Sequence, residues 1–393
     1  MAKTVQATAN HSVLLWARES AGFSVQEAAH KVSIAPEKLA ACERGDSFLT
    51  FRQLEELANS YKRPLALFYL PKPPSEALRI HDFRLDANVF QKPLSPALKI
   101  EIRRAHQRRD EALELSRELR QTPRRFSPAA SADEDAEIVA ARINQLLHID
   151  TAKRSFWKNA SAAYAARKAA VETLGVLVFE ASRIPVSEMR GLSLTFDQLP
   201  VAVINGADSH NGRSFSLLHE LTHLLLRQGG VCDLVFSESR SADARTEAFC
   251  NAVAAAALMP ATEILSLLPE PRTRAWTMDE LAGLAKPFRV SREAMLRRLV
   301  TLGRATRTHY FAMRSKFIEE YQQYRHDQKS DGDGGPSPAV MALRNLGKPF
   351  VELVFGAYAE DRIGLATVSD YLGVKLKHLP RIRDLMQKRE VTA

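Results

Sequence analysis

The feature that most constrains the fold of this chain is the pentapeptide His219-Glu220-Leu221-Thr222-His223, which lies inside an apolar run at residues 215–226. Residues four apart stand on one face of an α-helix, so the two histidines can offer their imidazoles to a single cation. The apolar neighbours predict that this helix is buried, where two histidines and a glutamate are costly unless they are paired or bind metal. The sequence therefore predicts a buried metal-binding helix. The alternative is a partly exposed helix whose polar residues are otherwise satisfied.

The residue types in this motif indicate zinc chemistry. Zinc is commonly bound by imidazole and carboxylate groups, and a catalytic zinc takes three protein ligands and keeps one position open. Glu220 is the expected general base, because it points to the side of the histidine pair, where it can take a proton from a water molecule at the metal. Glu247, on an alanine-rich helix, is the expected third ligand, with Asp243 as the alternative. Asn251 is expected to orient the carboxylate of Glu247. A glutamate that only favours the helix dipole is the other interpretation of Glu247.

Length and composition limit the class of protein. A chain of 393 residues predicts two or three domains, and 45% hydrophobic with 26% charged residues is typical of a soluble globular protein. We expect a cytoplasmic protein without membrane association, since no apolar run reaches the roughly 20 residues that span a bilayer and the first residues lack a signal-peptide core. Cys42, Cys232 and Cys250 form no disulfide or metal pattern and are expected to be reduced. The net charge of +9 is compatible with an acidic partner such as DNA, although a solvated basic surface is the commoner explanation.

Periodicity and composition divide the chain into five predicted segments. The first has short helical patterns that end at a proline-rich stretch, and the second carries a long helix of mixed charge, which favours a solvated connecting helix over a nucleic-acid-binding stripe. The third combines helices with short strands at residues 176–179, 191–196 and 201–204. The segments are a five-helix domain at 1–72, a basic connector with the long helix at 73–136, a mixed domain at 137–326, a linker at 327–339 and a helical unit at 340–393.

The N-terminal segment resembles XRE-type helix-turn-helix domains. Residues 17–29 match the opening of such domains, with Ser24 as a helix cap, and Cys42-Glu43-Arg44-Gly45 matches the end of their third helix. Lys38 and Arg44 are the expected DNA contacts on the outward face of that helix. Because the helix offers few donors that reach bases or phosphates, pairing with another protein is the alternative to DNA binding.

Four blocks of sequence resemble the ImmA/IrrE family of metallopeptidases over roughly residues 175–304. The resemblance implies a zincin-like, gluzincin-type domain in which His219, His223 and Glu247 bind Zn2+ and Glu220 activates water. Thr222 departs from the family, many members of which have glycine there. Known members cleave helix-turn-helix repressors. The blocks are GVLVF at 175–179, MRG at 189–191 with PVAVIN at 200–205, FSLLHELTHLL at 215–225, and EAFCN at 247–251 with LMP at 258–260.

These inferences predict a mainly α protein in which a small α+β peptidase domain lies between an N-terminal five-helix helix-turn-helix domain and a small C-terminal helical unit. The predicted function is zinc-dependent regulatory cleavage of a cytosolic helix-turn-helix repressor that controls stress-response, mobile-element or toxin-antitoxin genes. The alternative is a DNA-binding transcriptional regulator or antitoxin-type interaction protein whose peptidase fold does not cleave. An intact ligand set together with Glu220 favours the enzyme.

Three details stay open at the level of sequence. The residue that stabilises the oxyanion is one of His210, His309 and Tyr310, or none of them. The strand at residues 200–205 is either an edge strand that pairs with an extended substrate or an ordinary half-buried strand. The C-terminal unit is either a second helix-turn-helix-like unit that recognises protein or a helical hairpin that packs on the peptidase domain.

Overall fold

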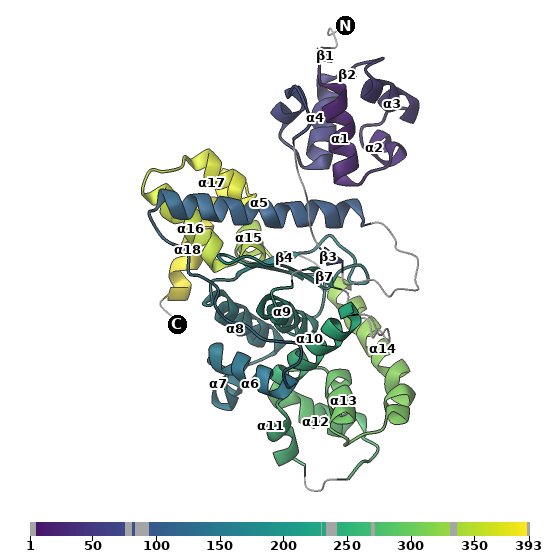
Figure 1. Ribbon diagram of the computed structural model, residues 1–393, viewed down its shortest axis with the longest axis vertical. Coiled ribbons are helices and arrows are strands. Elements are labelled where there is room, and N and C mark those ends of the chain that lie inside the picture. The colour runs from purple at the N-terminus through teal and green to yellow at the C-terminus, as the bar shows by residue number, and fades with distance from the viewer. Residues whose placement is uncertain are drawn as a thin grey trace. The chain divides into compact units, whose positions relative to one another are not determined.

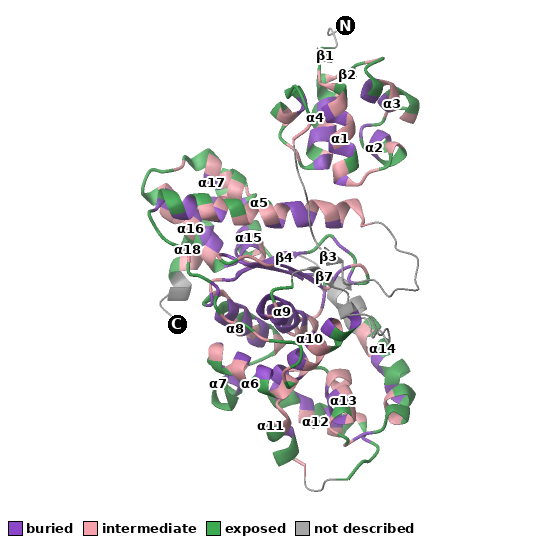
Figure 2. Ribbon diagram, viewed as in Figure 1, coloured by how far each residue is buried: buried purple, intermediate pink, exposed green. Residues whose placement is uncertain are grey.

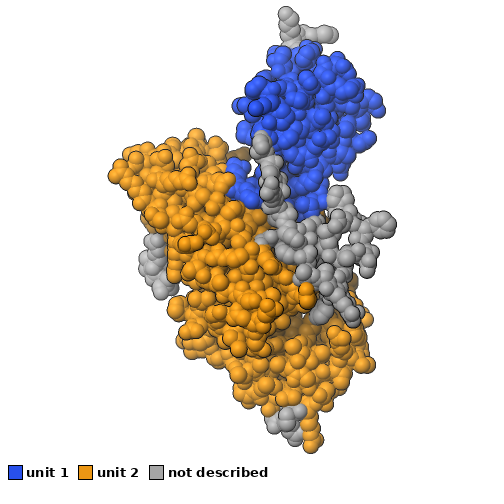
Figure 3. Space-filling model, viewed as in Figure 1, with its two compact units in different colours: residues 1–79, 90–107 blue, residues 80–89, 108–393 orange. Residues whose placement is uncertain are grey.

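The computed structural model describes residues 5–74, 81–82, 94–228, 230–232, 242–268, 272–330 and 336–390. The chain divides into two compact units, of which unit 1 comprises residues 1–79 and 90–107, and unit 2 comprises residues 80–89 and 108–393 (Figure 3). Helices predominate in both, and the described strands form one two-stranded and one five-stranded sheet (Figure 1). The predicted mainly α class with a small sheet is therefore confirmed. Within the described ranges, no helix is long and apolar enough to cross a membrane.

Unit 1 is a cluster of short helices whose ends follow their capping residues. Ser24 and Thr50 each form a capping box, at the starts of α2 and α4, and Pro36 opens α3. Gly45 ends α3 in the left-handed conformation with φ of 88°. The fifth predicted helix is only a short 3-10 helix. The elements are β1 (Gln6–Ala7), α1 (His11–Ala21), α2 (Val25–Lys31), α3 (Pro36–Arg44), β2 (Leu49–Thr50), α4 (Phe51–Tyr61) and the 3-10 helix Leu65–Tyr69.

A buried ion pair ties α1 to α3. Arg18 donates from Nε and a terminal nitrogen to the two carboxylate oxygens of Glu43, at 2.7 and 2.9 Å, and both residues are buried. Such a two-point contact fixes the orientation of the two side chains as well as their distance. The Glu-Arg-Gly end of α3 therefore has an inward glutamate that holds the unit together and an outward Arg44 that is exposed.

The long helix α5 (Pro96–Glu118) is less solvated than its charge pattern predicts. Arg103 is buried and donates to the backbone carbonyl groups of Tyr61 and Lys62. Further along, the guanidinium of Arg109 lies 3.9 Å from the centre of the Phe196 ring. The expectation of a solvated connecting helix is wrong at these positions, because arginine can cap carbonyl groups and stack on rings while its stem is buried.

Unit 2 contains a five-stranded sheet in the order β3-β7-β5-β6-β4. β4 and β6 are parallel, β5 is antiparallel to both β6 and β7, and β3 is parallel to β7. The three predicted strands are present, although β5 ends two residues earlier than predicted. The strands are β3 (His81–Asp82), β4 (Leu177–Ala181), β5 (Gly191–Leu194), β6 (Val201–Asn205) and β7 (Gly230–Cys232).

The strand order corrects one interpretation of the sequence. β6 lies between β5 and β4, and each of its residues is buried. It is therefore neither a substrate-binding edge strand nor a half-buried strand. Its uninterrupted apolar sequence is typical of a strand that is covered on both faces and paired along both edges.

Helices cover the sheet of unit 2. α9 (His210–Leu225) packs on β5 and β6, with α8 (Ala160–Glu172) and α10 (Ala242–Leu258) beside it, and it is buried along most of its length (Figures 1 and 2). The buried metal-binding helix predicted from the apolar run is thus the central helix of this layer. The other helices of the region are α6 (Ala136–Leu146), α7 (Thr151–Ser155), α11 (Ala261–Ser266), α12 (Met278–Phe288), α13 (Arg292–Thr301) and α14 (Arg307–Ser330).

The C-terminal helices belong to the same compact unit as the sheet. α15 lies against β4, and the ring of Phe350 meets the ring of Phe179 edge to face at 5.8 Å. Of the two interpretations of this unit, the structure thus supports a helical unit packed on the sheet domain. α14 continues to Ser330, into the segment predicted as a linker. The C-terminal elements are α15 (Pro338–Leu346), α16 (Lys348–Ala359), α17 (Leu365–Leu372), the 3-10 helix Leu376–His378 and α18 (Leu379–Glu390).

Candidate metal centre

The helix that carries the pentapeptide has a well-defined start. Ser209 caps α9 by accepting a hydrogen bond from the backbone of Gly212 at 3.1 Å. Further along, the Thr222 hydroxyl donates to the Leu218 carbonyl at 2.8 Å. A threonine hydroxyl that bonds back to the preceding turn is satisfied within its own helix. Threonine in place of glycine at position 222 therefore adds a buried hydroxyl that has its own hydrogen-bond partner.

Three side chains from α9 and α10 converge on one point. Nε2 of His223 lies 3.1 Å from Nε2 of His219 and 3.0 Å from Oε1 of Glu247, and Nε2 of His219 lies 3.3 Å from Oε2 of Glu247. Both histidines are fully buried, and the Glu247 side chain is 13% exposed. The structure thus brings together the three residues that the sequence predicts as ligands.

The distances between these donor atoms fit a small cation. A tetrahedral zinc ion with ligands at about 2.0 to 2.1 Å would separate neighbouring donor atoms by about 3.3 Å. The observed separations of 3.0 to 3.3 Å are close to that value. Two imidazole nitrogens and a carboxylate that all face one another are also the donor set that zinc prefers. The residues present therefore fit a bound metal ion.

The charges of the three residues depend on one another. Burial disfavours the ionised form of Glu247, but hydrogen bonds from His219 and His223 outweigh it and hold the pKa of the carboxyl well below its usual range. Burial also lowers the pKa of His223. At His219 burial acts in the same direction, but the hydrogen bond to Glu247 and the charges of Glu247 and Glu220 together outweigh it and raise the pKa. An ionised Glu247 and a neutral His223 are the forms that bind metal.

Two further residues of α10 flank the trio. Burial, together with the charges of Glu247 and Glu220, raises the pKa of the Cys250 thiol well above its usual value, so this cysteine stays protonated. Asn251 is close enough to His219 to contribute to the raised pKa of that histidine. The sequence predicts that Asn251 orients the carboxylate of Glu247, and in the structure Asn251 is also close to His219. The side chains of Asp243 and Cys232 lie outside the described residues.

The sequence offers His210, His309 and Tyr310 as candidates for the residue that stabilises the oxyanion. His210 begins α9 about two and a half turns before His219, since a turn takes about 3.6 residues. Nε2 of His309 accepts a hydrogen bond from the Trp276 backbone at 3.0 Å, and the Tyr310 hydroxyl donates to Glu293 at 3.0 Å. These contacts give His309 and Tyr310 roles in the packing of α12 to α14.

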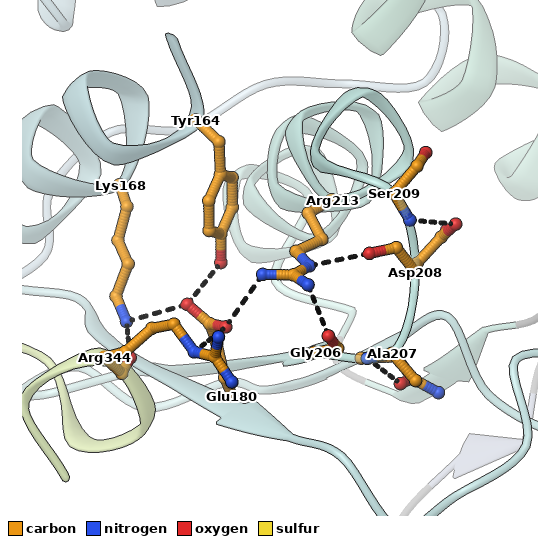
Figure 4. Close-up of polar contacts among 10 residues, drawn as sticks. Tyr164, Lys168, Glu180, Gly206, Ala207, Asp208, Ser209, Arg213 and Arg344 are labelled. Carbon is orange, nitrogen blue, oxygen red and sulfur yellow. Dashed lines mark hydrogen bonds and ion pairs between the residues drawn. The ribbon is translucent and has the colours of Figure 1, made fainter. Parts of the chain in front are cut away.

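A second polar cluster, which the sequence analysis missed, fixes the first turns of α9 (Figure 4). Its centre is Glu180 of β4, a buried carboxylate that accepts a hydrogen bond from Tyr164 at 3.1 Å. Arg213 of α9 reaches Glu180 at 3.4 Å and donates to the Asp208 carbonyl at 2.8 Å. Because the partners of Glu180 come from α8, α9 and α15, which are far apart in the sequence, no local motif could reveal them. Lys168 and Arg344 complete the cluster, each at 3.5 Å from a Glu180 oxygen.

The expected DNA contacts lie on the surface of α3. Lys38 and Arg44 are both exposed. Arg44 also pairs with Asp46 at 2.9 Å, and an ion pair between two exposed side chains is weak enough to exchange for another partner.

Part of unit 2 is similar to a known protein family. Residues 171–300 match a family model described as the IrrE N-terminal-like domain. The matched segment runs from α8 to α13 and includes His219, Glu220, His223 and Glu247. The family consists of metallopeptidases, so the match supports a peptidase-type domain with a metal site, and it confirms the predicted ImmA/IrrE likeness for this segment. No curated protein matches the chain.

Proposed function

We propose that this protein is a zinc-dependent regulatory endopeptidase that cleaves a cytosolic helix-turn-helix repressor. The observation that carries the proposal is the trio His219, His223 and Glu247, whose donor atoms lie at tetrahedral spacing beside the buried Glu220. The match of the surrounding segment to the IrrE N-terminal-like domain supports it. A protein that had lost cleavage could dispense with Glu220, because a buried carboxylate is costly to keep.

Each residue of the site has a part in the proposed chemistry. The two histidines and Glu247 would hold the ion, and Asn251 would orient His219. A zinc ion bound there acidifies water and polarises the scissile carbonyl group. Glu220 accepts the proton of the attacking water and returns it to the amine that leaves.

Unit 1 is proposed to bring the enzyme to its substrate. Its helices carry the XRE-type signature, and α3 exposes Lys38 and Arg44. These residues would contact DNA close to the bound repressor. The alternative is that the same face pairs with the helix-turn-helix domain of the repressor.

Metal binding tests the first part of the proposal. The purified protein is expected to hold about one zinc ion per chain, and a chelator should stop cleavage of the repressor until zinc is restored. Glu247→Gln should weaken zinc affinity at least about tenfold, because even the partners of metal ligands contribute that much. Asp243→Asn is the matched control and should bind zinc as the unmodified protein does. Equal loss of zinc in both variants would contradict the assignment of Glu247.

DNA binding tests the proposed role of unit 1. Lys38→Ala and Arg44→Ala are each expected to weaken DNA binding and to reduce the slope of log affinity against log salt by about one, as expected for the loss of a phosphate contact. Electrophoretic mobility shifts at several salt concentrations would measure this. The same slope in both variants and the unmodified protein would favour the protein-pairing alternative.

A further inference from the structure

Gly191 is the first residue of β5, the strand that lies against α9. A Cβ atom at this position would lie 2.3 Å from Oε1 of Glu220, 2.8 Å from its Cγ and 2.9 Å from its Cδ. These are the three nearest atoms. The space that a side chain would fill is therefore occupied by the carboxylate end of Glu220.

Backbone conformation does not account for a glycine here. Gly191 has no positive φ, so an L-residue could adopt its conformation. A glycine inside a strand lowers stability, because it loses more freedom on folding and packs no side chain. The close approach of Glu220 is the feature that gives this glycine a purpose.

The backbones of β5 and α9 are both held in place by their neighbours, so they cannot move away from each other. Gly191 is paired with Ile204 of β6 on one side and with Cys232 of β7 on the other. α9 is buried against the sheet, α8 and α10. The Glu220 side chain has several rotatable bonds and is the softest of these parts. A side chain at position 191 would thus displace the carboxylate and leave the strand and the helix in place.

We propose that Gly191 is a positioning residue for Glu220. Its missing side chain leaves the space that keeps the carboxylate beside the histidine pair. The inference rests on the proposed peptidase function and extends it, since it assigns to β5 a role in setting the position of the general base. A displacement of about 1 Å of a group that acts on the substrate can lower a rate by about a hundredfold.

Kinetics of Gly191→Ala test the positioning role. The variant should bind zinc as the unmodified protein does, while kcat for repressor cleavage falls by about ten- to a hundredfold and KM changes little. Combined with Glu220→Gln, it should cause no further loss, because the group that it displaces is already inactive. Gly283→Ala is the matched control, since a Cβ there meets nothing within 4 Å, and it should cleave normally. An unchanged kcat in Gly191→Ala would overturn the proposal.

A stability measurement tests the contact without any need for cleavage. In metal-free protein, Gly191→Ala should lower the urea midpoint when Glu220 is present and should not lower it in a Glu220→Ala background. An equal change in both backgrounds would overturn the proposal. If the two residues are coupled in stability but the unmodified protein cleaves no repressor, the contact is established and the peptidase function is rejected.

Discussion

Glu220→Gln is expected to bind zinc normally and to cleave the repressor at least about a hundredfold more slowly than the unmodified protein, since a general base contributes about two to four orders of magnitude. The amide has the shape of the carboxylate but cannot take a proton from water. Glu220 lies between the two histidines in the sequence, and its side chain is fully buried. It is not one of the three residues of the metal trio. Its loss should therefore separate catalysis from metal binding.

The experiment needs both measurements on the same preparation. Single-turnover cleavage gives the rate, and elemental analysis gives the zinc content. Glu319→Gln, an exposed glutamate on α14, is the matched control and should cleave at the unmodified rate. Undiminished cleavage by Glu220→Gln would remove Glu220 from the role of base, and loss of zinc would show that it supports the metal site instead.

The metal site could be predicted from sequence because most of it is local. The spacing of His219 and His223 fixes their common face once the segment is helical, and the apolar neighbours make it helical and buried. Glu247 depends on the packing of a second helix, which the helical pattern alone leaves open between it and Asp243. The resemblance to the ImmA/IrrE family resolves that choice, and the structure places Glu247 beside both histidines.

Strand order could not be predicted in the same way. The sequence at residues 201–205 indicates a strand, but whether it lies at an edge depends on which segments pair with it. β6 is flanked by a parallel strand that precedes it by about twenty residues and by an antiparallel one that directly precedes it. The sequence places Gly191 in the MRG block and at the start of a predicted strand, but its importance appears only when β5 is placed against Glu220.

Charged residues were also hard to interpret from sequence. Mixed charges along α5 indicate a solvated face, yet Arg103 and Arg109 are used in packing. Glu180 sits in an otherwise apolar strand and has partners on three helices. A buried carboxylate of this kind is stable only because those partners arrive from distant parts of the chain.

Glu172→Gln is expected to change how stability depends on pH. Glu172 ends α8, is partly buried, and has its carboxylate close to the backbone at the start of α16. Burial raises the pKa of this carboxyl to about 7, although the charge of Lys168 and the nearby backbone N–H of Lys348 act in the opposite direction. The charges of Glu352 and Glu180 add to the increase.

The sign follows from proton binding. Between the ordinary pKa of 4.5 and about 7, the folded protein holds a proton on Glu172 that the unfolded chain has lost, so stability falls as the pH rises through this window. The total loss is about 3 kcal/mol, because each pKa unit corresponds to about 1.4 kcal/mol. Glutamine resembles the protonated carboxyl and cannot ionise. The variant should match the unmodified protein near pH 4.5 and exceed its stability by up to about 3 kcal/mol at pH 8.

Urea unfolding at pH 5, 6, 7 and 8 measures this difference, with metal-free samples so that zinc binding does not contribute. Glu360→Gln, at an exposed position after α16, is the matched control and should follow the unmodified protein at every pH. Parallel stability curves for Glu172→Gln and the unmodified protein would contradict the assignment. A difference that grows from pH 5 to pH 8 would show that the junction between α8 and α16 is held most tightly when Glu172 is protonated.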